Sequence, residues 1–192
     1  MSKKTETELK FKLSKLPDSL KDHPYLIKQI YLKYDDQDLK NKISNLFLNV
    51  AIEWQNIAEV RIRAKVTRDD KLYFITLKTD GLLERDEYEN ILSEDQYNDF
   101  SRQPYIGAIV KFRYDVPILG TELIIEIDDY IGGLYGLQVA EIEFDQEKYT
   151  KEKIIEFAEK YLGEDIIDIT ADSKYKNKNL AKLNNIVENK SK

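Results

Sequence analysis

The sequence predicts an α+β protein that consists mainly of β-strands, organised as one domain over residues 1–192. Three observations support this fold class. Apolar and polar residues alternate with a period of two in about eight segments, which is typical of strands with one polar face. Segments with the apolar spacing of a helix are fewer than these alternating segments. Only 7 glycines and 4 prolines interrupt the chain, and no Gly/Ser linker marks a domain boundary.

Each alternating segment is an expected strand, because side chains two residues apart lie on the same face of an extended chain. One of these segments is shorter than the rest. The expected strands are residues 5–13, 28–33, 59–66, 72–79, 84–91, 108–115, 122–130 and 138–145.

Two helices are expected outside these strands, each with a recognisable start. Ser93 followed by Gln96 forms a capping box, which opens a helix over residues 94–101. Thr150 is a suitable N-cap for a second helix over residues 151–162, which carries an apolar stripe at helical spacing.

The C-terminal region is expected to form a basic helix at about residues 177–188. We expect this helix to dock on the body of the protein, although a frayed, solvated end stays open. The stretch 35–56 also stays open, because its apolar spacing is helical while its neighbours look extended. The apolar positions of the C-terminal helix are Leu180, Leu183 and Val187.

Composition excludes several classes of protein. The net charge of −6 argues against a generally basic nucleic-acid binder. Cysteine is absent, which removes disulfides, thiolate zinc sites and thiol nucleophiles, and the single histidine, His23, argues against a Ser-His-Asp hydrolase. No apolar run approaches the roughly 18 residues of a membrane span, and the N-terminus lacks the apolar stretch of a signal peptide. We therefore expect a cytoplasmic protein without a nucleic-acid or membrane partner.

The polar faces of the expected strands carry pairs of like charges two residues apart. Like charges roughly 6.6–7 Å apart do not stabilise each other, and a sheet would gain more from alternating signs. Two interpretations stay open: the charged faces look into water, or they point inward into a closed barrel. The pairs are Glu6/Glu8, Arg61/Arg63, Glu87/Glu89, Lys111/Arg113, Glu126/Asp128 and Glu141/Glu143.

The inward interpretation has a chemical consequence. Full burial of so many ions would cost several kcal/mol for each, against a total stability of about 5–15 kcal/mol, so a charged barrel must be wet and ion-paired. Arginine and lysine bind phosphate oxygens, and paired carboxylates suit a hard divalent cation such as Mg²⁺ or Mn²⁺. The matching ligand is a polyanion that binds together with a divalent metal.

The order of these motifs resembles the CYTH superfamily, the triphosphate tunnel metalloenzymes, from residue 5 to about residue 180. Glu6-Thr7-Glu8-Leu9-Lys10 matches the ExExK signature of that family. The closing motif departs from the family's RYxN, because a lysine replaces the usual arginine. The later motifs are Arg61-Ile62-Arg63, Thr76-Leu77-Lys78, Arg85-Asp86-Glu87-Tyr88-Glu89, Lys111-Phe112-Arg113-Tyr114, Glu126-Ile127-Asp128, Ala140-Glu141-Ile142-Glu143 and Lys174-Tyr175-Lys176-Asn177.

The resemblance implies a closed barrel of about eight antiparallel strands, a tunnel with helices packed outside, that hydrolyses a triphosphate with Mg²⁺ or Mn²⁺. It implies phosphate binding by Lys10, Arg61, Arg63, Lys78, Arg85, Lys111, Arg113, Lys174 and Tyr175. It implies metal binding by Glu6, Glu8, Asp128, Glu141 and Glu143. The implied catalytic residues are Glu6, Glu8, Lys10, Glu87 and Glu89, and which glutamate acts as the base stays open.

The substrate is less determined than the fold. Class IV adenylyl cyclases carry a His-Phe pair shortly before ExExK, which is absent here. Animal thiamine triphosphatases place a tryptophan just before RxR, where this chain has Glu59, and we expect Trp54 to be a core residue and His23 a bystander. Inorganic tripolyphosphate is therefore the simplest substrate. A cyclase, a thiamine triphosphatase and a non-catalytic polyphosphate-binding or nucleotide-binding module stay open, as does a homodimer.

Overall fold

A computed structural model describes residues 2–18, 20, 23–48, 50–80 and 84–190. Within these residues the chain is an α+β protein, with nine strands in one sheet and four α-helices outside it. The strands are β1 (Ser2–Lys12), β2 (Tyr25–Leu32), β3 (Ile57–Val66), β4 (Lys71–Thr79), β5 (Glu84–Leu92), β6 (Tyr105–Pro117), β7 (Ile124–Tyr130), β8 (Gln138–Glu143) and β9 (Ile167–Asp168). The helices are α1 (Gln37–Ser44), α2 (Glu94–Ser101), α3 (Lys151–Leu162) and α4 (Asn177–Lys190), with 3-10 turns η1 (Trp54–Asn56), η2 (Gly132–Leu134) and η3 (Ser173–Tyr175). No helix in this part of the chain is long and apolar enough to cross a membrane.

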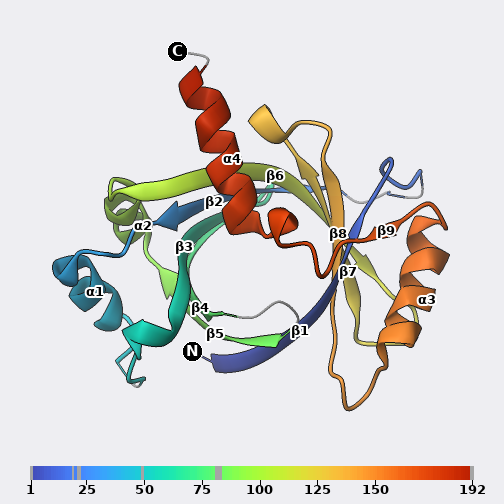
Figure 1. Cartoon of the computed structure of the whole chain (residues 1–192), viewed down its shortest axis with the longest axis horizontal. Coiled ribbons are helices and arrows are strands. Elements are labelled where there is room, and N and C mark those ends of the chain that lie inside the picture. Colours follow the sequence, from blue (N-terminus) through green and yellow to red (C-terminus); the bar gives the residue numbers. More distant parts are fainter. Residues whose placement is uncertain (1, 19, 21–22, 49, 81–83, 191–192) are drawn as a thin grey trace.

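The strands are antiparallel and follow the order β5-β4-β3-β2-β6-β7-β8-β1-β9 across the sheet. Strand β1 pairs with β8 over residues 8–12 and with β5 over residues 2–7. Figure 1 shows the strands arranged in a ring, with α1 and α2 on one side, α3 on the opposite side and α4 across one end. All eight expected strands are present, with ends that differ by up to three residues, whereas the two-residue β9 was not predicted.

The alternation of each strand separates an apolar outer face from a charged inner face. In β3, Val60, Ile62 and Ala64 are buried in an apolar cluster with α1 and α2, while Arg61 and Arg63 between them point to the inside. A fully buried Val or Ile side chain contributes about 1.5–3 kcal/mol. The packing that stabilises the ring therefore lies outside it, which leaves the interior available for charged residues.

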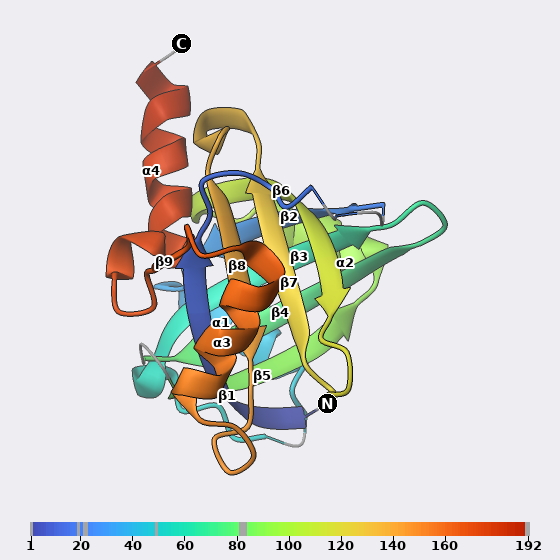
Figure 2. The ribbon, with the colours of Figure 1, turned by 90° about the vertical axis from the view of Figure 1, so that its right-hand side faces the viewer.

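Each helix covers part of the outer face. Ile43 of α1 and Phe100 of α2 pack in the cluster built on β3 and β4. Ile154 of α3 packs against β1, β7 and β8, and Figure 2 shows α3 lying across these strands. Leu180 and Ala181 of α4 belong to a third cluster, with residues of β2, β6 and β7.

The helix starts expected from the sequence are confirmed. Ser93 and Gln96 form the reciprocal capping box of α2, and the Thr150 side chain caps α3. The ambiguous stretch 35–56 begins with α1, whose N-cap is Asp36, and ends with η1. The helical spacing of this stretch therefore predicted an α-helix correctly only in its first part, at α1.

A close backbone contact holds α4 on strand β6. A Cβ atom at Gly107 of β6 would lie 2.1 Å from the carbonyl oxygen of Ala181 in α4. One turn of the helix further on, the Asn184 amide donates to the Ala108 carbonyl oxygen at 2.9 Å. Glycine at position 107 is thus required by the approach of the helix to the strand.

Replacing Gly107 with alanine is expected to destabilise the protein by about 1–3 kcal/mol, because the added methyl group forces backbone atoms apart. Thermal unfolding measures the loss, and hydrogen exchange shows where it acts. Amides of α4 should exchange faster in G107A, while those of α3, which packs elsewhere, keep the wild-type rate. Unchanged exchange in α4 would contradict this account of the contact.

Candidate functional site

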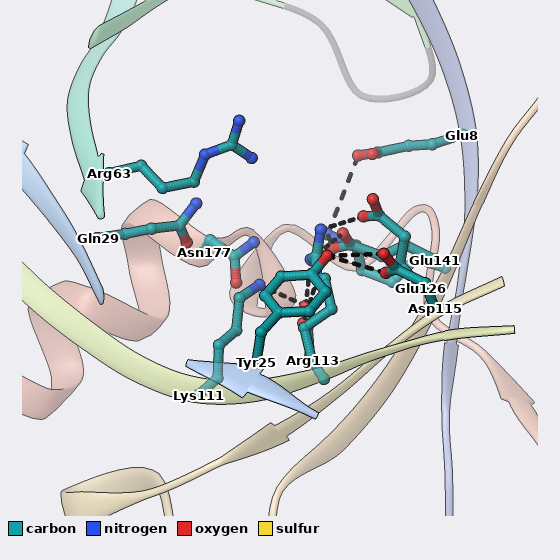
Figure 3. Close-up of polar contacts among 12 residues, drawn as sticks. Glu8, Tyr25, Gln29, Arg63, Lys111, Arg113, Asp115, Glu126, Glu141 and Asn177 are labelled. Carbon is teal, nitrogen blue, oxygen red and sulfur yellow. Dashed lines mark hydrogen bonds and ion pairs between the residues drawn. The ribbon is translucent and has the colours of Figure 1, made fainter. Parts of the chain in front are cut away.

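The inner face of the sheet surrounds a cavity of about 1050 Å³. Each of the strands β1 to β8 contributes lining residues, together with the start of α4. Figure 3 shows Arg63 and Gln29 on one side of this space and Glu8 and Glu141 on the other. The cavity therefore gathers residues from the whole length of the chain.

Most of the charged residues in the sequence motifs line this cavity. The basic ones are Lys10, Arg61, Arg63, Lys78 and Arg113. The acidic ones are Glu8, Glu87, Glu89, Glu126, Glu141 and Glu143. Over all described lining residues, ten acidic side chains stand against seven basic ones. A polyanion therefore needs accompanying cations to bind here, because the lining carries an excess of negative charge.

Strands β1 and β8 place four charged residues together. Glu8 lies directly opposite Glu143, and Lys10 lies directly opposite Glu141. The Lys10 Nζ atom is 2.7 Å from Glu141 Oε1 and 3.9 Å from Glu8 Oε1. Directly opposed like charges such as Glu8 and Glu143 destabilise a sheet. This pair is suited to binding a cation rather than to stabilising the fold.

The described residues contain no group of three or more acidic or histidine side chains placed to hold a metal ion. Mg²⁺ does not require such a group, because it usually binds through one or two carboxylates together with substrate phosphates and water. The opposed carboxylates of Glu8 and Glu143 therefore match the donor set of a metal that binds together with a phosphate substrate.

A buried ion network fixes Arg113 in the wall of the cavity. Asp128 accepts hydrogen bonds from Arg113 Nε and Nη2, both at 2.6 Å, and pairs with Lys111. Arg113 Nη2 also lies 3.3 Å from Glu141 Oε2, and Nη1 contacts Glu126 (Figure 3). A bidentate carboxylate contact of this kind orients the guanidinium group.

Burial and neighbouring charges shift the pKa of three members of this network. Burial alone would raise the pKa of Glu141, but Lys10 and the other nearby bases outweigh it and hold this pKa well below its usual range. Burial, together with the charge of Arg113, lowers the pKa of Lys111 to about 8. Burial also disfavours the charged form of Arg113, but contact with Asp128 keeps the pKa of Arg113 well above its usual value.

Strands β3, β4 and β5 form a second charged wall. Arg63 Nη2 is 3.0 Å from Glu89 Oε2, and the Thr76 hydroxyl donates to the same oxygen at 2.9 Å. Lys78 forms an ion pair with Glu87. Burial lowers the pKa of Arg63 from its ordinary value. Each of these bases is thus held by a carboxylate of the neighbouring motif.

The structure does not bring every expected site residue to the cavity. Lys111 and Asp128 are buried in the wall, with 0% of either side chain exposed, and neither lines the cavity. Lys174 and Tyr175 lie in η3, also outside the lining. The Lys174 side chain is 72% exposed and pairs with Asp172 at 2.9 Å.

Two expected site residues are described only by their backbones. Glu6 in β1 lies opposite Arg85 in β5, which aligns the ExExK motif with the RxExE motif. The side chains of Glu6 and Arg85 lie outside the described part of the chain, as does that of Val187 in α4.

The cavity lining also includes residues that were not in the predicted site, among them Gln29, Glu59, Lys176 and Asn177. Glu59 lies two residues before Arg61 on the same strand face, so strand periodicity was a signal for it. Gln29 is an uncharged residue in a short strand. Only the pairing of β2 with β3 and β6 identifies it as a residue of the cavity lining. The last two follow η3, whose course the sequence did not predict.

Trp54 and His23 lie outside the lining, as expected. Trp54 packs against the cluster under α1, and its Nε1 atom donates to Ser44 Oγ at 3.0 Å. His23 is exposed in the loop before β2.

Comparisons with known proteins agree with this fold. No protein-family model matches the sequence. The chain is 29% identical over 177 residues to an inorganic triphosphatase from Nitrosomonas europaea, which covers 92% of this chain and 97% of that protein. The solved structure of the inorganic triphosphatase NE1496 matches with a TM-score of 0.53 and 25% identity, over 92% of this chain and 94% of that one. A putative adenylate cyclase from Bacillus halodurans shares the fold, with a TM-score of 0.50, 19% identity, and coverage of 85% and 92%.

The charged inner face of the sheet and the similarity to the triphosphatase indicate the same fold. The resemblance seen in the motifs is confirmed, and the chain has the fold of the CYTH superfamily, the triphosphate tunnel metalloenzymes.

Proposed function

We propose that this protein is a metal-dependent triphosphatase that hydrolyses inorganic tripolyphosphate inside the cavity. The observation that carries the proposal is a set of five bases around one space, which also holds the opposed pair Glu8 and Glu143. Similarity to an inorganic triphosphatase over 92% of the chain supports the same reaction. The five bases are Lys10, Arg61, Arg63, Lys78 and Arg113.

The sheet, in this proposal, closes into a tunnel of eight strands. The pairing of β1 with β5 supports closure, because these strands begin and end the order β5-β4-β3-β2-β6-β7-β8-β1. A closed sheet leaves no unpaired edge among these strands. It would also hold the bases of β3 and β6 at a constant distance from the carboxylates of β1 and β8.

The metal in this proposal is Mg²⁺ or Mn²⁺, and Glu8 and Glu143 are the residues that would hold it. Lys10 and Arg113 contact the carboxylate of the neighbouring Glu141. When bound, the metal would neutralise phosphate charge and lower the pKa of a water molecule. The excess of acidic over basic lining residues supports a role for cations in binding the polyanion.

The residues of the chain bind and orient the substrate in this mechanism. Arg61 and Arg63 project from one strand face and would hold phosphate oxygens from one side, while Arg113 would do so from another. Water then attacks a terminal phosphorus in line with the P–O bond to the bridging oxygen. This bond breaks, pyrophosphate leaves with the bridging oxygen, and a cavity glutamate accepts a proton from the attacking water. Positioning and charge neutralisation supply most of the rate enhancement in phosphoryl transfer.

The lining of the cavity favours an inorganic substrate. Among the described lining residues the single aromatic is Phe144, which is buried in the cluster under α3. A nucleoside or thiamine group would gain affinity from an aromatic stacking partner. The cavity offers charge for phosphates without such a partner for a ring.

Phosphate release from a panel of substrates tests the proposal. Tripolyphosphate, ATP, thiamine triphosphate and pyrophosphate are compared with Mg²⁺ and with Mn²⁺, and kcat/KM values rank them. Tripolyphosphate should be the preferred substrate. A tenfold preference for ATP or thiamine triphosphate, formation of cyclic AMP, or binding without turnover would overturn it.

Removal of metal is expected to abolish activity. EDTA should reduce tripolyphosphate hydrolysis to background, and added Mg²⁺ or Mn²⁺ should restore it. Glu8→Gln should weaken Mn²⁺ binding, measured by calorimetry, because an amide is a poorer ligand than a carboxylate. Glu156→Gln on the exposed surface of α3 is the matched control and should bind Mn²⁺ normally. Full activity of the metal-stripped enzyme would contradict the metal requirement.

A further inference from the structure

Gln29 of β2 is a buried amide in the cavity wall that the proposed mechanism does not use. Only 2% of this residue is exposed, yet it lines the cavity. Burial of an amide costs free energy unless its donor and acceptor groups form hydrogen bonds, and glutamine is therefore mostly found at protein surfaces. Both ends of the Gln29 amide thus need hydrogen-bond partners.

The hydroxyl of Tyr31 determines how this amide is oriented. Tyr31 lies two residues further along the same strand face, is 0% exposed, and donates to Gln29 Oε1 at 3.4 Å. Within the part of the chain that the structure describes, this oxygen is the only acceptor for the hydroxyl. The carbonyl end of the amide therefore faces Tyr31. Figure 3 shows the nitrogen end on the side of Arg63.

The nitrogen end of the amide is open to the cavity. An amide nitrogen carries two N–H donors. Among the described residues, no protein group accepts a hydrogen bond from Gln29 Nε2. Because Gln29 lines the cavity, the contents of the cavity are the partner that remains for these donors.

Arg63 presents a second open donor next to this amide. It lies directly opposite Gln29 in the pairing of β2 with β3, where Cβ atoms on one face are about 4.5–5.5 Å apart. Its Nη2 atom is 3.0 Å from Glu89, and its guanidinium carbon lies 4.8 Å from the centre of the Phe74 ring. These contacts orient the guanidinium group, whereas Nη1 has no acceptor among the residues described. Two neighbouring donors therefore line the same space.

We propose that Gln29 Nε2 donates a hydrogen bond to the same phosphate group that Arg63 holds, which makes Gln29 a substrate-binding residue of the cavity. The inference rests on the proposed function. The non-bridging oxygens of one phosphate group accept hydrogen bonds from both donors, and a bond to such a charged oxygen is stronger than one between neutral groups. Because the amide is neutral, it contributes affinity without adding charge.

Steady-state kinetics of Gln29→Leu tests this role. KM for tripolyphosphate should rise about tenfold, the loss typical of one hydrogen bond to a charged group. The value of kcat should change little, because the bond is present both in the bound substrate and in the transition state. The ratio of the KM of Q29L to that of the wild type should be the same at low and high salt, because Gln29 carries no charge for salt to screen.

Two further variants control for effects on folding. Gln29→Asn keeps an amide in the wall but withdraws it by one methylene group, so it should also raise KM and gives the same test if Q29L unfolds. Gln55→Leu makes the same chemical change at an exposed position in η1, outside the cavity lining, and should keep the wild-type KM. Thermal unfolding is measured for each variant in parallel.

A double-mutant cycle tests whether Gln29 and Arg63 bind the same phosphate group. Arg63→Lys keeps the positive charge and removes the forked donor geometry. Residues that share one bound group do not act independently, so the loss of affinity in Q29L/R63K should be smaller than the product of the two single losses. Losses that multiply would show that the two residues bind separate groups, and would overturn the shared contact.

The remaining outcomes are distinct. A wild-type KM in the folded variants Q29L and Q29N, or an equal loss in Q55L, would overturn substrate binding by Gln29. A KM ratio that decreases as salt is added would show a general electrostatic effect, and would overturn it as well. Absence of tripolyphosphate turnover in the wild type would instead overturn the proposed function itself.

Discussion

Replacing Asp128 with alanine is expected to lower the free energy of unfolding by about 3–5 kcal/mol, the usual cost of removing one partner from a buried ion pair. Asp128 has no exposed surface and is the shared partner of Lys111 and Arg113. Without this carboxylate, the positive charges of Lys111 and Arg113 stay buried in the wall without the anion that they share. Urea unfolding measures the difference.

Asp129 provides a matched control for this prediction. It is the next residue of β7 and accepts one hydrogen bond, from Gln138 at 3.2 Å. Asp129→Ala should cost about 1 kcal/mol, the usual contribution of one hydrogen bond. Equal stabilities of D128A and D129A would show that the buried network does not stabilise the fold.

The isosteric variant Asp128→Asn separates two roles of this residue. The family resemblance implies a metal ligand, whereas Asp128 lies outside the cavity lining and contacts Arg113. We expect D128N to bind Mn²⁺ as the wild type does and to lose affinity for tripolyphosphate, because Arg113 is less firmly held. Loss of Mn²⁺ binding with unchanged substrate affinity would favour the ligand role.

Replacing Arg113 with lysine is expected to reduce kcat/KM for tripolyphosphate by about 100-fold. A preorganised hydrogen-bond donor that contacts the charge developing in the transition state raises the rate by about 10²–10³-fold. Lysine cannot reproduce the planar, forked donor geometry of the guanidinium group. Arg113 is oriented by Asp128 and reaches the cavity beside Glu126 and Glu141. Lysine keeps the positive charge, so most of the fold stability should remain.

The corresponding control is Arg102→Lys, an exposed position at the end of α2 that lies outside the cavity. Its kcat/KM should equal that of the wild type. The unfolding temperature of both variants is measured in parallel. Wild-type activity of R113K would show that a point charge is sufficient at this position.

Much of the fold could be predicted from the sequence, because it depends on local periodicity. A period of two places Arg61 with Arg63, and Glu141 with Glu143, on one strand face whatever the surrounding structure. The capping box at Ser93 is likewise local, since its hydrogen bonds join residues three apart. The motifs that line the cavity belong to this predictable part of the protein.

Pairing and burial could not be predicted in the same way. The pairing of Glu8 with Glu143 could not be predicted from the sequence. The two residues are 135 positions apart, and the register of β1 and β8 depends on the whole sheet. The stretch 35–56 was ambiguous for a related reason, since α1 is stabilised by packing against β3 and β4. These features depend on contacts between distant segments.

By itself, the sequence determined which side chains share a face and therefore the chemical character of the cavity. The tertiary structure alone decided how deep each side chain lies. Lys111 and Arg113 occupy the same face of β6, yet Lys111 is enclosed in the wall beside the ring of Tyr130, while Arg113 lines the cavity. Lys174 and Lys176 differ in the same way. The depth of a side chain is set by the elements that pack around it, and local periodicity carries no information about them.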